Sequence, residues 1–265
     1  MTAPITVPEL RARKARGDKI ACLTVYDATF ARVLERSGVD VALVGDSLGV
    51  VVQGRPATVA VTLEQMAYHV GCVRRGLERP LVLADLPFAS YVHPHQAVAS
   101  AAELVRAGAQ MVKLEGGRQR LEVVKALVAE GIPVCGHLGL LPQSIHRLGR
   151  YRVQGSDPQA AQRLLEDACL LEEAGVDLLV LECIPATLAE AVTAEVAVPT
   201  IGIGAGPHCD GQVLVLHDLL GLWFEGRPPR FVQDFLAAGG GIEEAVRAYV
   251  EAVRQGRFPT AEQSY

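Results

Sequence analysis

The sequence predicts an α/β protein, a (β/α)8 TIM barrel formed by one domain over residues 1–265, with a short N-terminal helix. Short apolar runs rich in β-branched residues alternate with helical patterns along the chain. Four of these runs end in an acidic residue, as in residues 39–49, where an apolar stretch turns to Gly45 and Asp46. No linker-like segment divides the chain. The alternative, an open doubly wound sheet, needs a topological switch point that the even spacing does not indicate.

Eight apolar runs are expected to form the strands of the barrel. An apolar run of this length without a polar break is typical of a strand buried on both faces of a parallel sheet. The expected strands are residues 20–25, 39–44, 81–85, 111–117, 134–140, 178–182, 200–206 and about 212–217.

Helices are expected before, between and after these strands, and capping signals mark several of their first residues. The spacing of a capping box occurs at Thr6 with Glu9, Thr62 with Gln65 and Thr187 with Glu190, and the pair Asp157 and Pro158 has the N-cap and N1 pattern. The expected helices lie within residues 1–20, at 30–38, 62–76, 96–107, 121–131 and 157–175, from 187 onward, and at 242–253. The basic side chains of the first helix are expected to form a solvated face. Two long loops, 50–61 and 141–156, are expected to border a site.

Composition narrows the class of partner. Half of the residues are hydrophobic and the formal net charge is −5. This balance predicts no nucleic-acid partner and favours small-molecule substrates. No N-terminal apolar segment and no run of about 18 apolar residues is present, so no membrane association is expected. The six cysteines are scattered without a CxxC pair, which fits a reducing cytoplasm.

The acids at the strand ends predict one shared site, because the carboxyl ends of barrel strands form a single mouth. The residues expected to meet there are Asp46, Ser47, Asp85, Lys113, Glu115, His137 and Glu182. Two like charges about 5 Å apart repel by roughly 3 kcal/mol at an effective dielectric near 20. Four carboxylates facing one lysine therefore require either protonation of some acids or a bound cation.

An all-oxygen set of ligands favours a hard divalent ion such as Mg²⁺. We assign Asp46, Asp85 and Glu115 to the metal and Glu182 to proton removal, although the residue pattern by itself does not separate the four acids. A metal beside Lys113 and a serine suits a substrate with a carboxylate next to a carbonyl. A base would then remove the adjacent carbon-bound proton to give an enolate, which predicts formation or cleavage of a carbon–carbon bond.

Three of these residues have simpler interpretations. Capping or turning the chain after its strand is the alternative for Ser47, but the neighbouring Asp46 favours a role in the site. An unpaired lysine in an apolar run is costly, so Lys113 is expected to be functional or ion-paired. His137 has two interpretations of equal weight, a contact with substrate or a hydrogen-bonded core histidine.

Several long motifs resemble one known family. They are VYDATFARVLERSGVDVALVGDSLGVVVQG at 25–54, KLEGG at 113–117, GHLGLLPQS at 136–144, LECIP at 181–185 and IGIGAGPHCDGQVLV at 201–215. Together they are similar to the ketopantoate hydroxymethyltransferase family over nearly the whole chain. The segments 149–155 and 57–62 differ from the usual family pattern, which leaves the two loops open in detail but does not alter the acidic positions.

The resemblance implies a barrel enzyme that transfers a hydroxymethyl group from 5,10-methylenetetrahydrofolate to 3-methyl-2-oxobutanoate, giving 2-dehydropantoate for pantothenate biosynthesis. It implies magnesium at Asp46, Asp85 and Glu115, the last through water. It also implies contacts of Asp46, Ser47, Asp85 and Lys113 with the keto acid, and Glu182 as the proton acceptor. A cytoplasmic homo-oligomer, commonly a decamer, is implied as well.

Two alternatives stay open at this level. One is a magnesium-dependent lyase or mutase of the phosphoenolpyruvate mutase and isocitrate lyase type, which shares the barrel and the acids but relies on a reactive cysteine in a loop. The other is a non-catalytic barrel that binds a keto acid.

Overall fold

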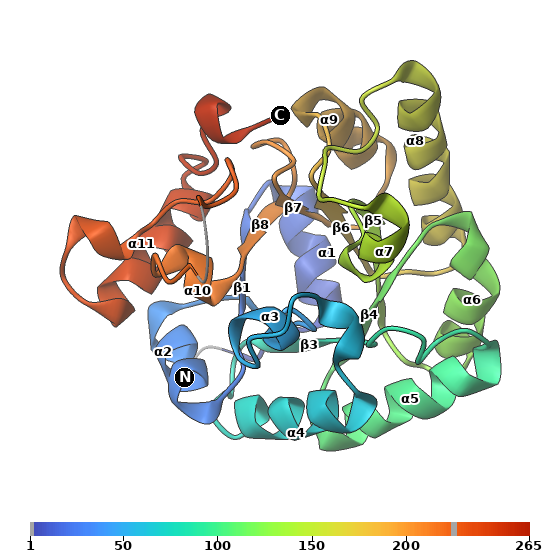
Figure 1. Cartoon of the computed structure of the whole chain (residues 1–265), viewed down its shortest axis with the longest axis horizontal. Helices are drawn as coiled ribbons and strands as arrows, with labels where there is room; N and C mark the ends of the chain where they lie inside the picture. Colours follow the sequence, from blue (N-terminus) through green and yellow to red (C-terminus); the bar gives the residue numbers. More distant parts are fainter. Residues whose placement is uncertain (1–2, 224–226) are drawn as a thin grey trace.

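The strands of the computed structural model, which describes residues 3–223 and 227–265, close into a parallel barrel as predicted. Each strand pairs with the next along the chain, and the last strand pairs with the first (Figure 1). The strands are β1 (Ile20–Thr24), β2 (Val41–Val44), β3 (Leu81–Asp85), β4 (Met111–Glu115), β5 (Val134–Gly139), β6 (Leu178–Glu182), β7 (Thr200–Ile203) and β8 (Gly211–Leu214).

The longer helices other than α1 (Val7–Arg16) form a ring around this barrel (Figure 1). They are α2 (Ala28–Ser37), α4 (Leu63–Arg74), α5 (Pro94–Ala107), α6 (Leu121–Ala129), α8 (Pro158–Glu173), α9 (Ala186–Glu195) and α11 (Ile242–Arg254). Helix α1 lies behind the strands in the view of Figure 1, at the amino-terminal end of the barrel. In the described part of the chain, none of the helices has the length and apolar character needed to cross a bilayer.

Strand register brings the functional side chains to one level of the barrel. Nearly every strand residue is buried, which agrees with the uninterrupted apolar runs of the sequence. At the carboxyl ends, Asp85 lies opposite Lys113 in the neighbouring strand, and Glu115 lies opposite His137. Residue 139 in turn lies opposite Glu182. The pairing of strands β3 to β6 therefore brings five predicted site residues to the same end of the barrel: Asp85, Lys113, Glu115, His137 and Glu182.

One predicted capping box is only half formed, and one predicted helix start differs in the structure. Thr6 accepts a hydrogen bond from the Glu9 backbone N–H, but the Glu9 carboxylate pairs with Arg13 and Arg16 instead of closing the box. The predicted cap at Thr187 is wrong. Helix α9 already begins at Ala186, with Pro185 at the N-cap, so Thr187 lies inside the first turn.

The basic face of α1 is only partly solvated, contrary to the expectation. Leu10 is fully buried, and the neighbouring Arg13 and Lys14 side chains are mostly buried. Arg13 pairs with Asp40 at 2.9 Å, and Lys14 pairs with Asp210 at 3.0 Å. These ion pairs tie α1 to strand-flanking residues, at Asp40 just before β2 and at Asp210 just before β8.

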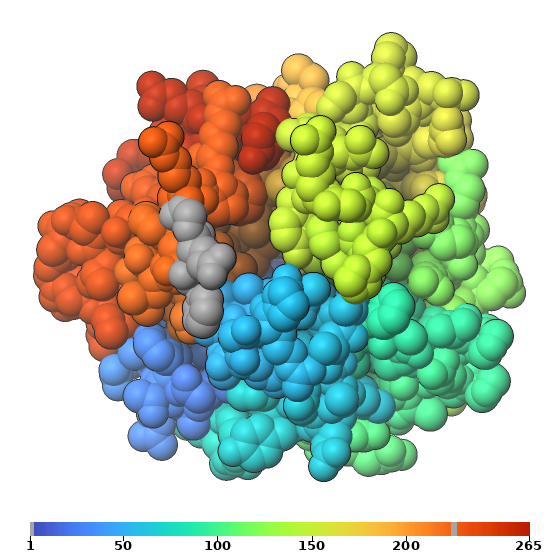
Figure 2. Space-filling view, viewed as in Figure 1, coloured from blue at the N-terminus to red at the C-terminus, as the bar shows by residue number. Residues whose placement is uncertain are grey.

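The last strand is shorter than predicted, because β8 ends at Leu214 and His217 belongs to a short helix, α10 (Leu216–Leu219). The two long loops also contain short helices: α3 (Leu48–Val51), η1 (Thr58–Ala60), η3 (Pro142–Ser144) and α7 (Ile145–Leu148). Elements η1 and η3 contact each other, and Figure 2 shows the segments that follow β2 and β5 side by side on the face of the molecule viewed there. The two loops therefore border the barrel mouth together.

Candidate active site

All seven residues predicted for the site line one cavity of about 150 Å³ at the carboxyl ends of the strands. They are Asp46, Ser47, Asp85, Lys113, Glu115, His137 and Glu182. The cavity is comparable in volume to an engineered cavity of about 150 Å³ that admits benzene, so it has room for a small acid.

Lys113 lies at the centre of this cluster. Its side chain is almost wholly buried, and Nζ lies 2.9 Å from Asp85 Oδ1 and 3.3 Å from His137 Nδ1. Burial disfavours the ammonium, but the negative charges of Asp85, Glu115 and Asp46 outweigh it and raise the pKa of Lys113 above its usual value. The lysine is therefore ion-paired and stays charged, as one of its sequence-based interpretations required.

The carboxylates that face Lys113 are hard to ionise together. Burial, and then the nearby charge of Asp85, raise the pKa of Asp46 to about 7. Burial also raises the pKa of Glu115 well above its usual range. The backbone N–H of Asp46 donates to Asp85 Oδ2 at 3.0 Å, so the two aspartates lie next to each other. This is the crowding of negative charge that the sequence predicted.

Glu182 and His137 form the other side of the cluster. Burial raises the pKa of Glu182 to about 8. Burial, and then the Lys113 charge, lower the pKa of His137 well below its ordinary value, so the imidazole is neutral. His137 Nε2 lies 3.1 Å from Glu182 Oε2 but makes no hydrogen bond of acceptable geometry in the described structure. His137 thus separates the lysine from Glu182 and faces the cavity.

Ser47 does not cap the helix that follows it. It is the residue before α3, and it makes no side-chain capping bond there. Its hydroxyl lies 2.9 Å from the Tyr26 hydroxyl, which donates in turn to Thr24 Oγ1. The Ser47 side chain is therefore held at the cavity wall by a hydroxyl chain.

Gln143 lies within the GHLGLLPQS motif and is a site residue that the sequence did not predict. Its side-chain amide donates to Asp46 Oδ2 at 2.9 Å and to the Leu86 carbonyl at 3.0 Å. Its backbone N–H donates to Glu115 Oε2 at 3.0 Å. A buried glutamine from the loop after β5 therefore connects two of the predicted acids, which no periodicity in the sequence signals.

A glycine at the end of β5, Gly139, allows the backbone of Glu182 in β6 to approach closely. Gly139 has φ of 95°, and a Cβ built there would lie 2.1 Å from the Glu182 carbonyl oxygen. Only glycine combines this backbone conformation with such a close approach.

The described residues contain no group of three or more His, Cys, Asp or Glu side chains that forms a ready-made metal cage. Magnesium does not require one, since it commonly binds through one or two carboxylates and keeps several waters. The adjacent Asp46 and Asp85 carboxylates supply oxygen donors of the right kind. Asp85 Oδ1 is also buried without a hydrogen bond of good geometry, although Lys113 is close to it. The donor set thus fits a hard divalent cation.

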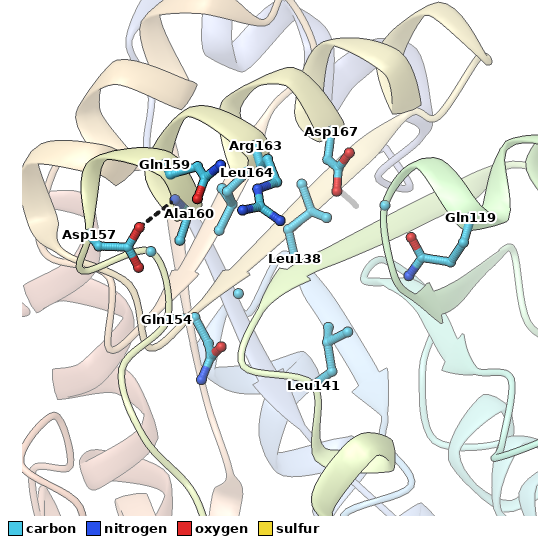
Figure 3. Close-up of a pocket in the computed structure, with 13 residues that line it drawn as sticks. Gln119, Leu138, Leu141, Gln154, Asp157, Gln159, Ala160, Arg163, Leu164 and Asp167 are labelled. Atoms are coloured by element: carbon cyan, nitrogen blue, oxygen red, sulfur yellow. Dashed lines mark hydrogen bonds between the residues drawn. The ribbon is translucent and has the colours of Figure 1, made fainter. Parts of the chain in front are cut away.

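A separate polar cavity of about 360 Å³ lies outside the mouth, between the end of β5 and the first half of α8 (Figure 3). Both of its acids have structural roles. Asp157 caps α8 by accepting from the Ala160 N–H, and Asp167 pairs with Arg118. None of the predicted site residues lines this cavity.

Comparison with known proteins decides the family. A family model described as ketopantoate hydroxymethyltransferase matches residues 4–261. The chain belongs to the ketopantoate hydroxymethyltransferase family. A 3-methyl-2-oxobutanoate hydroxymethyltransferase of Methylococcus capsulatus is 60% identical over 266 residues, covering 100% of this chain and 98% of that relative. The enzyme of the same name from Aromatoleum aromaticum is 56% identical, over 99% of this chain and 97% of the relative.

Solved structures of low sequence identity share the fold of this family member. A phosphonopyruvate hydrolase in complex with oxalate and Mg²⁺ superimposes with a TM-score of 0.63 at 13% identity, covering 97% of this chain and 92% of that one. A phosphoenolpyruvate phosphomutase from Streptomyces platensis subsp. rosaceus gives 0.62 at 14% identity, covering 81% and 82%. These likenesses support the barrel fold and carry no further conclusion about chemistry.

Proposed function

We propose that this member of the family transfers a hydroxymethyl group from 5,10-methylenetetrahydrofolate to 3-methyl-2-oxobutanoate, giving 2-dehydropantoate. The observation that carries the proposal is the buried cluster in which Lys113, Asp46 and Glu182 line one small cavity. The cluster offers a cation for a carboxylate, oxygen donors for a metal and a basic carboxylate for a carbon-bound proton. Relatives that share more than half of their residues with this chain carry the name of that activity.

Substrate binding would use the positive and hydroxylic side of the cavity. Lys113 and Ser47 would hold the carboxylate of the keto acid, with the ammonium supplying charge-assisted hydrogen bonds. Asp46 and Asp85 would hold magnesium directly, and Glu115 would reach it through water, as the family resemblance implies. The metal, when bound, supplies Lewis acidity toward the keto oxygen.

Proton removal would fall to Glu182. Burial raises the pKa of this carboxyl group to about 8, so its ionised form is a stronger base than a solvated glutamate. It would take the C3 proton of the keto acid, and the resulting carbanion would form the new bond to the one-carbon unit. The neutral His137, whose Nε2 lies 3.1 Å from Glu182 Oε2, would not compete for the proton. Transfer consumes one water, which would add to the methylene carbon; the bonds from that carbon to N5 and N10 would break, and each nitrogen would take up a proton, leaving tetrahydrofolate and formaldehyde. The carbanion would add to the formaldehyde carbon, and the resulting alkoxide would take up the proton held by Glu182 to give the hydroxymethyl group.

We also propose that residues 1–265 act as a single catalytic domain, that the protein works in the cytoplasm, and that it assembles as a homo-oligomer, a decamer by family resemblance. Limited proteolysis of the purified protein would test the single domain, and analytical ultracentrifugation would test the oligomer. Fractionation of cells would test the location in the cytoplasm.

The chemistry is tested by proton NMR of 3-methyl-2-oxobutanoate in deuterated buffer, before and after methylenetetrahydrofolate is added. We expect magnesium-dependent loss of the C3 proton signal without folate, and 2-dehydropantoate once folate is present. Persistence of the proton signal and absence of product under both conditions would overturn the proposal.

A further inference from the structure

A larger outer cavity shares part of its wall with the inner cavity at the barrel mouth. It has a volume of about 610 Å³, and Ser47, Glu182 and Asp218 line both this outer cavity and the inner one. Volumes of about 300 to 1,000 Å³ are typical of pockets that bind drug-sized ligands. The inner cavity alone is too small for a folate, so a large co-substrate that meets the keto acid at Glu182 has this outer cavity available.

Asp218 supplies a carboxylate to the wall that the two cavities share. It lies on α10, which follows β8, and its side chain is half-buried. Within residues 3–223 and 227–265, no donor or cation pairs with its side chain. Burial alone raises its pKa, to about 6, so no neighbouring charge compensates it. A partly desolvated carboxylate without a partner is costly in a folded protein, and such a group is commonly retained for a ligand.

The remaining wall of the outer cavity suits a flat aromatic ring with an anionic tail. Aromatic side chains, Tyr151 and Phe231, line it together with aliphatic ones such as Val50 and Leu140. Two arginines, Arg152 and Arg227, also line it, and both are exposed. Rings favour such walls through offset or edge contacts, and guanidinium groups bind carboxylates in a bidentate manner.

We propose that the outer cavity receives the pterin ring of the folate co-substrate, with Asp218 accepting two parallel hydrogen bonds from the 2-amino group and N3–H of the ring. The 2-amino-4-oxo edge of a pterin presents two adjacent N–H donors, much as a guanidinium does, so a carboxylate is its natural acceptor. The glutamate tail then extends toward Arg152 and Arg227. This inference rests on the proposed function and adds to it the residue that would recognise the pterin ring by hydrogen bonding.

The test combines a variant with a ligand analogue. Binding of tetrahydrofolate and of its 2-desamino analogue is measured by anaerobic calorimetry on the wild type and on Asp218→Asn. Hydrogen bonds to a charged group contribute enough that we expect about 10- to 100-fold weaker tetrahydrofolate binding by the variant. The wild type should bind the 2-desamino analogue more weakly than tetrahydrofolate by a similar factor. For Asp218→Asn the two affinities should differ far less, because the variant and the analogue each remove the same hydrogen bond between the carboxylate and the 2-amino group.

Glu190→Gln is the matched control, since it removes an exposed carboxylate from α9 outside the cavity. It should bind both ligands as the wild type does. If Asp218→Asn bound tetrahydrofolate with unchanged affinity, the assignment of Asp218 would be overturned. If the variant failed to fold, equal affinity of the wild type for both ligands would overturn it just as well. If the wild type still transferred the one-carbon unit in either of these cases, the assignment of Asp218 would fail but the proposed function would stand. If the wild type neither bound tetrahydrofolate nor formed product, both the assignment and the proposed function would fail.

Discussion

Replacing Lys113 with methionine tests whether this one ammonium compensates the buried carboxylates. At the 2.9 Å between Lys113 Nζ and Asp85 Oδ1, attraction amounts to about 6 kcal/mol at an effective dielectric of 20. Desolvation of both groups offsets part of this attraction. Removing one partner of a buried pair commonly costs about 3 to 5 kcal/mol, because the other charge stays buried without compensation. We expect a loss of that size in the free energy of unfolding of Lys113→Met.

The assay is urea denaturation at pH 8 without magnesium, with Lys125→Met as the matched control. Lys125 makes an ion pair of similar length, 3.1 Å to Glu122, but both side chains are exposed. Exposed pairs contribute about 1 kcal/mol or less, so the control should lose little. Adding Asp85→Asn to Lys113→Met should restore part of the loss. Equal losses in the two methionine variants would refute the reasoning that Lys113 compensates the acids.

Three further predictions follow from burial and backbone geometry. Asp218→Asn should be more stable than the wild type at pH 8 by up to about 3 kcal/mol in the free energy of unfolding. The raised pKa means that the folded state favours the protonated acid, so the stability of the wild type falls as pH rises through about 6, and the variant does not share this fall. Urea denaturation should show the two proteins converging near pH 4. Gly139→Ala should unfold more easily and lose activity, because its Cβ would meet the Glu182 carbonyl; Gly131→Ala, with a similar φ of 73° but open space, should lose only about 1 kcal/mol. Magnesium at 100 times its Kd should stabilise the wild type by about 2.7 kcal/mol and Asp46→Asn by much less, as measured by thermal denaturation.

Each of these has a clear contrary result. A less stable Asp218→Asn at pH 8 would mean that the carboxylate has a partner in the fold. Equal effects of the two glycine substitutions would show that strain at positive φ, rather than the contact with Glu182, decides the cost. Equal stabilisation of Asp46→Asn by magnesium would place the ion elsewhere.

The barrel could be predicted from the sequence because its strands are buried on both faces. Such strands form short apolar runs with an acid at the end, and that pattern located Asp46, Asp85 and Glu182 without any coordinates. Errors arose at boundaries. A proline at position 185 starts α9 before Thr187, and a short helix replaces the expected end of β8. These are local backbone choices that apolar periodicity does not encode.

Within the site, the sequence predicted which residue types converge but not how they pair. Gln143 comes from a loop, and its contact with Asp46 joins residues 97 positions apart, so no local pattern could signal it. The neutral state of His137 likewise depends on complete burial beside Lys113. Asp218 was not singled out, because a single acid on a four-residue helix resembles any surface carboxylate until the cavity beside it is known.

In the proposed reaction, the buried Glu182 carboxylate removes the C3 proton of the keto acid. The most direct measurement is the rate of C3 proton exchange into deuterated buffer, with magnesium and without folate, for the wild type, Glu182→Gln and the exposed control Glu122→Gln. We expect Glu182→Gln to bind the keto acid yet exchange about 100- to 10,000-fold more slowly, the usual contribution of a positioned base, while Glu122→Gln matches the wild type. Exchange by Glu182→Gln at close to the wild-type rate would contradict the account and require another base.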